Sequence, residues 1–221
     1  LYALSTCNRI GQQRLIQMLA EFALPDLGAV ADFILTRSHA ATLARIAALP
    51  MGTATGQMRI DGYAAPVDLC VTVSINADHV LCDWTGTSGL DPKGINVPLV
   101  YTKAYACYAL KCAIASLAPF RVTAPKDTIV NAVHPAPVAL RHVIGHLVPD
   151  TVFAALDQLL PGVVPAEGAG CLCNFQLSLR PGKNAPDGAI RAQVLTFNSG
   201  GTGARPALDG LSATAFPSGV M

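Results

Sequence analysis

The residues of this chain best suited to close contact with a ligand lie near its end, in the stretch FNSGGTGARPALDGLSATAFPSG at 197–219. Glycine has no Cβ, so Gly200, Gly201 and Gly203 can adopt positive φ and let the backbone approach a ligand closely. Successive N–H groups of such a loop can converge on an anion. Two interpretations stay open here: a cradle for phosphate or carboxylate, and a structural turn that binds nothing.

Arg205 follows these glycines directly, and Asp209 comes four residues later. A guanidinium at this position could hold a phosphate or a carboxylate through two parallel hydrogen bonds. The alternative is an ion pair between Arg205 and Asp209 that closes the loop, and both roles can coexist. Neither G-x-x-x-x-G-K-[ST] nor G-x-G-x-x-G is present, so the pattern predicts neither a Walker loop nor a dinucleotide site.

A second candidate site is the segment DWTGTSG at 83–89. In an extended chain, Asp83, Thr85 and Thr87 point to one face and Trp84 to the other. A carboxylate beside two hydroxyls can orient a polar substrate, hold Mg²⁺ through water, or contact a phosphate. The alternative is a strand end whose Asp and Thr side chains satisfy backbone groups of a turn.

His142, His146 and Asp150 are four residues apart and would line one stripe of an unbroken helix, as zinc ligands can. Val143 stands where the H-E-x-x-H motif would have its glutamate, and Pro149 disturbs the turn before Asp150. We therefore expect a polar flank of a helix and predict no complete metal site.

Cysteine and serine chemistry offers no further candidate. Cys171 and Cys173 would point to opposite faces of a strand, which is typical of structural thiols rather than of a zinc knuckle. No G-x-S-x-G nucleophile motif occurs. The chain has seven cysteines, an odd number, and most lie in apolar stretches, which favours reduced, buried thiols.

Composition limits the class of protein. Hydrophobic residues make up 52% and charged residues 13%, so the surface is poor in charge and we expect a partner. The longest charge-free runs are roughly 13 residues, short of the ~20 that a membrane-spanning helix needs. With no signal peptide at the start, we predict a cytoplasmic protein. The net charge of +1, without a Lys/Arg cluster, argues against nucleic-acid binding.

The elements that must position these residues follow from hydrophobic periodicity. Apolar residues at helical spacing predict helices over 12–22 and from Leu27 to about Leu49, with Asp26 as N-cap, together forming an αα-hairpin. Alternation over 67–75 and 80–84 predicts an antiparallel β-hairpin, extended by 56–60.

The second half of the chain is predicted in the same way. Asn96 as N-cap and Pro98 in the first turn would open an apolar helix over 99–117. Short strands at 120–124 and 128–132 would flank a turn, and Pro149 must kink or divide a helical region over 138–160. Strands near 172–179 and 192–198 would lead into the glycine block.

The predicted fold class is therefore mixed α+β, with an antiparallel hairpin or sheet packed against apolar helices. The predicted domains are a helical hairpin at 1–50 and a mixed α/β core at 51–221.

The glycine block also resembles the C-terminal signature of the hydantoinase B / 5-oxoprolinase family. Five further stretches match this family in order: MRIDGY at 58–63, DWTGTSG at 83–89, GINVPLVYTKAYA at 94–106, ALRHVIGHLVPD at 139–150 and VPAEG at 164–168. The resemblance runs through nearly the whole chain. It implies an internal fragment of a longer subunit, with a loop near Ser116 that is shorter than is common in the family.

The resemblance implies the B subunit of an ATP-dependent cyclic amidase that acts on hydantoin, N-methylhydantoin or 5-oxoproline-type rings together with a hydantoinase A-type subunit. The ring carbonyl would be phosphorylated, and water would then open the ring. ATP and Mg²⁺ are implied for the complex, with none expected on this chain alone. Two alternatives are a subunit of an acetone- or acetophenone-type carboxylase and a non-catalytic assembly module.

In that family setting, the expected catalytic residues are Asp83, Thr85, Thr87 and Arg205. The expected substrate- or phosphate-binding residues are Asn96, Arg141, His142, Gly200, Gly201, Gly203 and Asp209.

Overall fold

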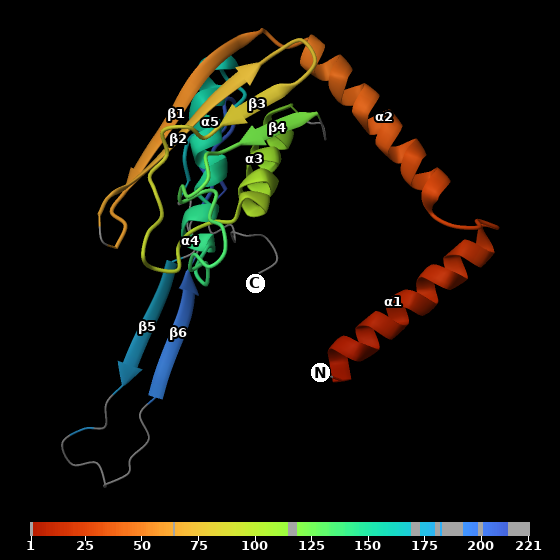
Figure 1. The fold of residues 1–221 in the computed structure, drawn as a ribbon, viewed down its shortest axis with the longest axis horizontal. Helices are drawn as coiled ribbons and strands as arrows, with labels where there is room; N and C mark the ends of the chain where they lie inside the picture. Colours follow the sequence, from red (N-terminus) through yellow and green to blue (C-terminus); the bar gives the residue numbers. More distant parts are fainter. Residues whose placement is uncertain are drawn as a thin grey trace.

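The computed structural model describes residues 2–63, 65–114, 119–168, 173–179, 182, 192–198 and 201–211. A compact body carries an arm of two helices on one side and a two-stranded ribbon on another (Figure 1). The elements are α1 (Tyr2–Glu21), α2 (Gly28–Ala47), β1 (Gly52–Ile60), β2 (Val67–Ile75), β3 (Val80–Asp83), α3 (Leu99–Ile114), β4 (Phe120–Thr123), α4 (His142–Gly145), α5 (Val148–Leu159), β5 (Cys173–Leu179) and β6 (Ala192–Asn198). None of the described helices is long and apolar enough to cross a membrane.

The central sheet has the strand order β1-β2-β3-β4. β1 pairs with β2, and β2 with β3, in the predicted antiparallel arrangement. β4 instead runs parallel to β3, so the sheet is mixed. The cause is α3, which carries the chain from the end of β3 back to the start of β4, as a parallel pair requires.

The strand predicted over 128–132 is wrong. Within this segment only Thr128 forms an isolated bridge, to Gly89. The Thr128 hydroxyl donates to the Pro125 carbonyl at 2.8 Å, and the Asn131 amide donates to the Ala124 carbonyl at 2.7 Å. Such local side-chain hydrogen bonds to the backbone favour turns over strands.

The hydrophobic core lies between the sheet and the helices α3 and α5. The five alternate residues of β2 from Val67 to Ile75 are buried in it, as the period of two predicts. Gly56 of β1 faces α5 so closely that a Cβ would collide with the Thr151 carbonyl. Both helices therefore cover one face of the sheet.

The opposite face of the sheet, called here the open face, carries polar side chains and is not covered by any described helix (Figure 1). Cross-strand hydroxyl pairs and the ion pair between Arg59 and Asp68, with 2.6 Å between Nε and Oδ1, lie on it. Its residues are Thr53, Thr55, Gln57, Arg59, Asp68, Cys70, Thr72, Ser74, Leu81, Asp83, Arg121 and Thr123.

The helical region at 138–160 is divided, as Pro149 predicts. α4 ends at Gly145, and α5 begins at Val148 with Pro149 in its first turn, where a proline needs no N–H partner. A Cβ on Gly145 would collide with the Tyr101 ring, so α4 packs tightly against α3. His142 and Asp150 consequently belong to different helices.

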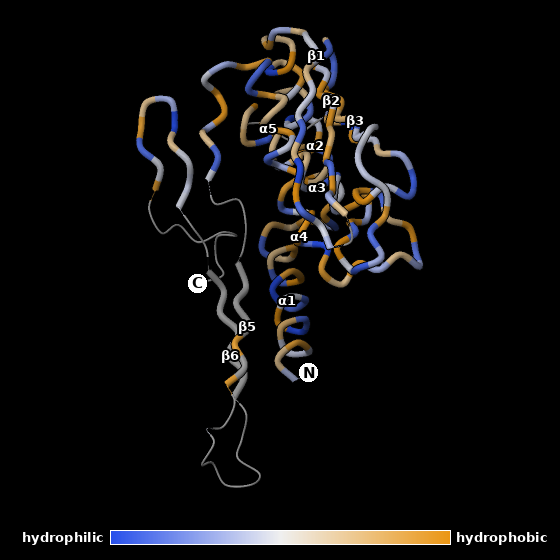
Figure 2. The backbone as a smooth tube through the Cα atoms, turned by 90° about the vertical axis from the view of Figure 1, so that its left-hand side faces the viewer, coloured by the Kyte–Doolittle hydropathy of each residue, from blue (hydrophilic) through white to orange (hydrophobic). Residues whose placement is uncertain are grey.

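Both N-terminal helices form, α2 close to its predicted bounds and α1 from Tyr2 instead of residue 12. They diverge from the turn between them and do not pack side by side (Figure 1). The turn contains Ala23 at φ 51° and directs α2 away from α1. No residue of α1 is buried, and hydrophobic residues are spread along it (Figure 2). Asp26 lies one residue before the observed N-cap, and its carboxylate still accepts a hydrogen bond from the Gly28 N–H at 2.7 Å.

The cysteines differ from expectation in part. Cys82 is buried, and burial raises the pKa of its thiol to about 12. Cys70 and Cys107 are partly buried, whereas Cys7 and Cys112 are exposed. Cys171 and the side chain of Cys173 lie outside what the structure describes.

Candidate functional site

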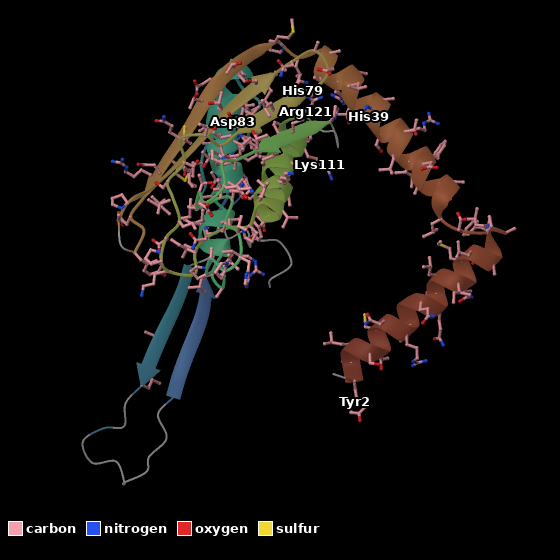
Figure 3. The ribbon with its side chains drawn as sticks, viewed as in Figure 1. Tyr2, His39, His79, Asp83, Lys111 and Arg121 are labelled. Carbon is pink, nitrogen blue, oxygen red and sulfur yellow. The ribbon has the colours of Figure 1, made fainter. Side chains whose placement is uncertain are left out.

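The carboxylate of Asp83 lies at the end of β3 and is held by two hydroxyls. Its Oδ1 accepts hydrogen bonds from the Thr85 hydroxyl at 2.9 Å, the Thr85 N–H at 3.2 Å and the Thr123 hydroxyl at 3.3 Å. Thr123 is the register partner of Asp83 on β4. Asp83, Thr85 and Thr123, called here the Asp83 cluster, form a polar group on the open face, where Figure 3 labels Asp83.

Thr123 was not among the predicted site residues. The sequence carries no local signal for it, because it lies 40 residues from Asp83 and meets it only through the parallel pairing of β3 and β4.

Thr87 does not join this cluster. Its hydroxyl donates to the Cys70 carbonyl at 2.9 Å and accepts from the Cys70 N–H at 3.0 Å. The expected shared face is lost because the chain turns at Gly86, with φ 96°, and runs on beside β2 after β3 has ended. The Thr87 hydroxyl thus bonds to the two backbone groups of Cys70 that a neighbouring strand would otherwise pair with. This is a structural role, in which a side chain satisfies backbone groups.

Asn96 holds a loop rather than the start of α3. Its side chain is fully buried; its Oδ1 accepts from the Asp91 N–H, and its Nδ2 donates to the carbonyls of Asp91, Lys93 and Pro137 at 2.8–3.0 Å. The helix begins after Pro98, whose carbonyl accepts from the Thr102 N–H at 3.2 Å. Both polar atoms of the Asn96 amide are therefore hydrogen-bonded to backbone groups, which is a structural role.

The glycines at 201–210 bring two parts of the chain into contact. A Cβ on Gly203 would collide with the Ala166 carbonyl, and one on Gly210 would collide with the Thr202 carbonyl. The Ala166 N–H donates to the Ala204 carbonyl at 2.7 Å. The glycine block therefore packs on the stretch VPAEG at 164–168, which supports a structural reason for these glycines. Gly200 lies outside the described residues.

Arg205 closes its loop through backbone groups. Its N–H donates to the Leu208 carbonyl at 2.8 Å, and its Nη2 donates to the main-chain carbonyl of Asp209 at 3.1 Å. The expected ion pair with the Asp209 carboxylate is not formed. Within the described part of the chain, no carboxylate pairs with this guanidinium.

Arg205 is one of the residues that line a cleft of about 440 Å³, called here the Arg205 cleft. The cleft lies between α3, α5 and the two loops that the glycine block brings together. Its lining is Tyr108, Cys112, Ala113, Phe153, Val163, Pro165, Arg205 and Pro206. No sequence motif predicted it, because the lining residues come from four separate segments.

Of the four residues expected to be catalytic, only Asp83 and Thr85 are brought together. Val80 and Cys82 of β3 are buried in the core beneath the helices, and Asp83 alternates to the open face. Arg205 lies on the helix side, beside α3 and α5. The structure thus presents two candidate sites on opposite sides of the sheet.

The residues near α4 give a third, weaker group. The Arg141 guanidinium donates to the Val138 carbonyl at 3.2 Å, and His146 Nδ1 is hydrogen-bonded to the His142 carbonyl. Burial lowers the pKa of His146. No three His, Cys, Asp or Glu side chains in the described ranges are grouped so that they could hold a metal ion.

Asp150 lies close to Glu167, a residue of the stretch 164–168 that packs on the glycine block. Burial, and then the charge of Glu167, raises the pKa of Asp150 to about 6. Its carboxyl group therefore changes charge close to neutral pH.

Comparison with known proteins identifies the family. The family model described as hydantoinase B/oxoprolinase matches residues 1–221. A Pseudomonas sp. (strain NS671) protein, provisionally named as the B subunit of a D-/L-hydantoinase, is 29% identical over 223 residues, covering 91% of this chain and 37% of that protein. An uncharacterized protein of Methanocaldococcus jannaschii is 32% identical over 117 residues, covering 49% of this chain and 21% of that protein.

Two solved structures share the fold. The ATP-dependent caprolactamase from Pseudomonas jessenii matches with a TM-score of 0.72 at 21% identity, over 94% of this chain and 38% of that chain. Nucleotide-free acetone carboxylase matches with a TM-score of 0.68 at 17% identity, over 90% of this chain and 30% of that chain.

The chain thus spans 37% of the length of the Pseudomonas relative and 21% of that of the Methanocaldococcus relative. Because the family model covers the whole of it, the chain belongs to the hydantoinase B/oxoprolinase family.

Proposed function

We propose that this chain is part of the B subunit of an ATP-dependent enzyme that opens cyclic amides. The observation that carries the proposal is the end-to-end match to the hydantoinase B/oxoprolinase family model. The fold shared with an ATP-dependent caprolactamase supports the same chemistry. Amide resonance makes direct attack by water slow, and a phosphorylated carbonyl oxygen is a good leaving group, which explains a requirement for ATP.

The Asp83 cluster is the part of this chain proposed to act on the substrate or on the attacking water. All three of its hydrogen bonds fall on Oδ1. Oδ2 therefore stays available, among the described residues, to accept from water or from a ring N–H. Two hydroxyl donors fix the carboxylate in place, so that orientation is its main contribution.

We propose no nucleotide site on the described residues of this chain. The N–H groups of Thr202 and Arg205, which a phosphate cradle would need, already donate to the carbonyls of Leu211 and Leu208. ATP and Mg²⁺ are therefore proposed to bind the assembled complex.

A hydantoinase A-type subunit is the proposed partner. The Pseudomonas relative is named as a B subunit, which supports a second subunit in the working enzyme. The apolar side chains exposed on the arm α1–α2 agree with a partner as well, since they are otherwise left in water.

A ketone carboxylase is the second candidate, favoured by the fold shared with acetone carboxylase. The test is to assay the chain, assembled with its partner subunit, with hydantoin, 5-oxoproline, caprolactam and acetone plus bicarbonate. We expect ring opening that requires ATP. Turnover of acetone plus bicarbonate without ring opening would replace this proposal by the carboxylase, and no turnover of any substrate would leave only an assembly role.

A further inference from the structure

The Arg205 cleft has the size and lining of a site for a small organic molecule. Its volume of about 440 Å³ lies within the range of roughly 300–1,000 Å³ that is usual for such sites. Tyr108 and Phe153 contribute aromatic rings, while Val163, Pro165 and Pro206 contribute aliphatic surface. A lining of this kind favours a ring or a short hydrocarbon chain.

Arg205 is the charged member of this lining, and much of its hydrogen-bonding capacity is unused. Nη2 donates to the Asp209 carbonyl at 3.1 Å, and the other guanidinium N–H groups have no partner among the described residues. A guanidinium next to apolar surface favours an oxygen anion, which it can bind through two hydrogen bonds.

Tyr108 belongs to the same lining, and its phenol interacts with Cys112 one turn further along α3. The charge of the Cys112 thiol, followed by a hydrogen bond to it, raises the pKa of the Tyr108 phenol. The phenol therefore stays protonated, and the Tyr108 ring, rather than its O–H, is the part offered to an apolar ligand.

We propose that the Arg205 cleft binds a small monocarboxylate with an apolar body, its carboxylate on Arg205 and its ring or chain against Tyr108 and Phe153. The natural source of such a ligand rests on the proposed function, because water that opens a cyclic amide leaves a carboxylate at the former carbonyl carbon and an amine at the nitrogen. The cleft would then hold the acid end of a ring-opened product after it has left the Asp83 cluster, which lies on the other side of the sheet.

A phosphate or a nucleotide suits this place less well. Among the described residues, one guanidinium provides the only positive charge of the lining, and the neighbouring backbone N–H groups of Thr202 and Arg205 are taken. The adjoining stretch 164–168 adds the negative charge of Glu167. A monoanion with an apolar body can pair its single charge with Arg205, whereas a phosphate or a nucleotide would bring further negative charges without a partner in the cleft.

The test is a titration of the purified chain with hexanoate, followed by ligand-observed NMR, with 1-hexanol as the uncharged counterpart. We expect hexanoate to bind at least about tenfold more tightly than 1-hexanol, since a charge-assisted hydrogen bond contributes a factor of roughly this size. Inorganic phosphate should not displace it. Equal affinity for both compounds, no binding of hexanoate, or displacement by phosphate would overturn the inference.

Variants locate the binding in the cleft. Arg205→Met should lower hexanoate affinity about tenfold or more and leave 1-hexanol binding unchanged. Arg121→Met, which removes an exposed arginine on the open face, should change neither. Val163→Trp fills the cleft from a half-exposed position and should abolish the binding of both hexanoate and 1-hexanol. This variant gives an independent result if Arg205→Met does not fold. Hexanoate binding that survives both cleft variants would contradict the site.

The outcomes separate this inference from the proposed function. A chain that binds hexanoate through Arg205 but supports no ring opening would contradict only the proposed function. A complex that opens rings while its chain does not bind hexanoate would contradict only the cleft.

Discussion

The Asp83 cluster and the Arg205 cleft are built in different ways, although one charged residue of each, Asp83 and Arg205, lies in a short motif of the sequence. The Asp83 cluster uses the register of two parallel strands, and its side chains bond to one another. The Arg205 cleft is made by two loops packed on helices, and the polar atoms near it bond mainly to backbone. The register of the sheet fixes the positions of side chains that bond to one another, as in the Asp83 cluster. The shape of the loop at Arg205 depends instead on its contacts with a distant segment of the chain.

The two places also differ in what surrounds the charge. Asp83 lies among hydroxyls on a polar surface, and Arg205 lies beside aromatic and aliphatic surface. Orientation of a polar group suits the first, and binding of an apolar acid suits the second. Variants that disturb one side of the sheet at a time can test this difference.

The largest expected effect is the loss of the loop contact beneath the Arg205 cleft. Gly203→Ala forces a Cβ into the Ala166 carbonyl, so that one of the two loops must move. We expect a loss of about 2–3 kcal/mol in the free energy of unfolding, measured by urea denaturation, together with weaker hexanoate binding. Gly11→Ala is the control, because a Cβ added at this position of α1 meets no other atom. If both variants had the same free energy of unfolding, the packing of Gly203 against Ala166 would be contradicted.

A smaller effect is expected where Thr87 supports β2. Thr87→Val removes the hydroxyl that serves both the N–H and the carbonyl of Cys70, which leaves two backbone groups without a partner. We expect a loss of about 2 kcal/mol in the free energy of unfolding, measured by urea denaturation. Thr85→Val is the matched control on the exposed side of the same turn and should lower the free energy of unfolding clearly less. A larger loss for Thr85→Val than for Thr87→Val would contradict the structural role of the Thr87 hydroxyl.

The smallest effect concerns the charge of Asp150 and appears only as a dependence on pH. Its folded-state pKa of about 6 lies above the ordinary value of 3.8, so the folded protein binds this proton more tightly than the unfolded chain does. The resulting stabilisation is complete below about pH 4 and is lost as pH rises through 6.

Asp150→Asn should therefore raise the melting temperature above pH 6 and leave it nearly unchanged at pH 4, as measured by calorimetry at both values. Asp157→Asn, an exposed position on the same helix, is the control. A gain of equal size at both pH values would contradict the burial of the Asp150 charge.

Local patterns predicted much of the fold. The alternation of β2, the division of the helical region at Pro149 and the strand β6 all depend on residues within one element, where periodicity and proline geometry decide the outcome.

Long-range contacts explain what the sequence did not predict. Asn96 has the residue type of an N-cap, yet its side-chain amide donates a hydrogen bond to the carbonyl of Pro137, 41 residues away. Likewise, Thr123 meets Asp83, and Val163 lines one cleft with Tyr108, only after the sheet and the loops have formed. No single-element pattern reports such pairs.

The central claim, that the Asp83 cluster acts in ATP-dependent ring opening, is tested most directly by two isosteric variants on the open face. Asp83→Asn keeps the shape of the cluster and removes its charge, while Asp68→Asn removes a charge that is paired with Arg59 on the same face. In the assembled enzyme we expect Asp83→Asn to lower kcat by about a hundredfold or more, and Asp68→Asn to leave it within about twofold. Equal kcat values for the two variants would contradict the account.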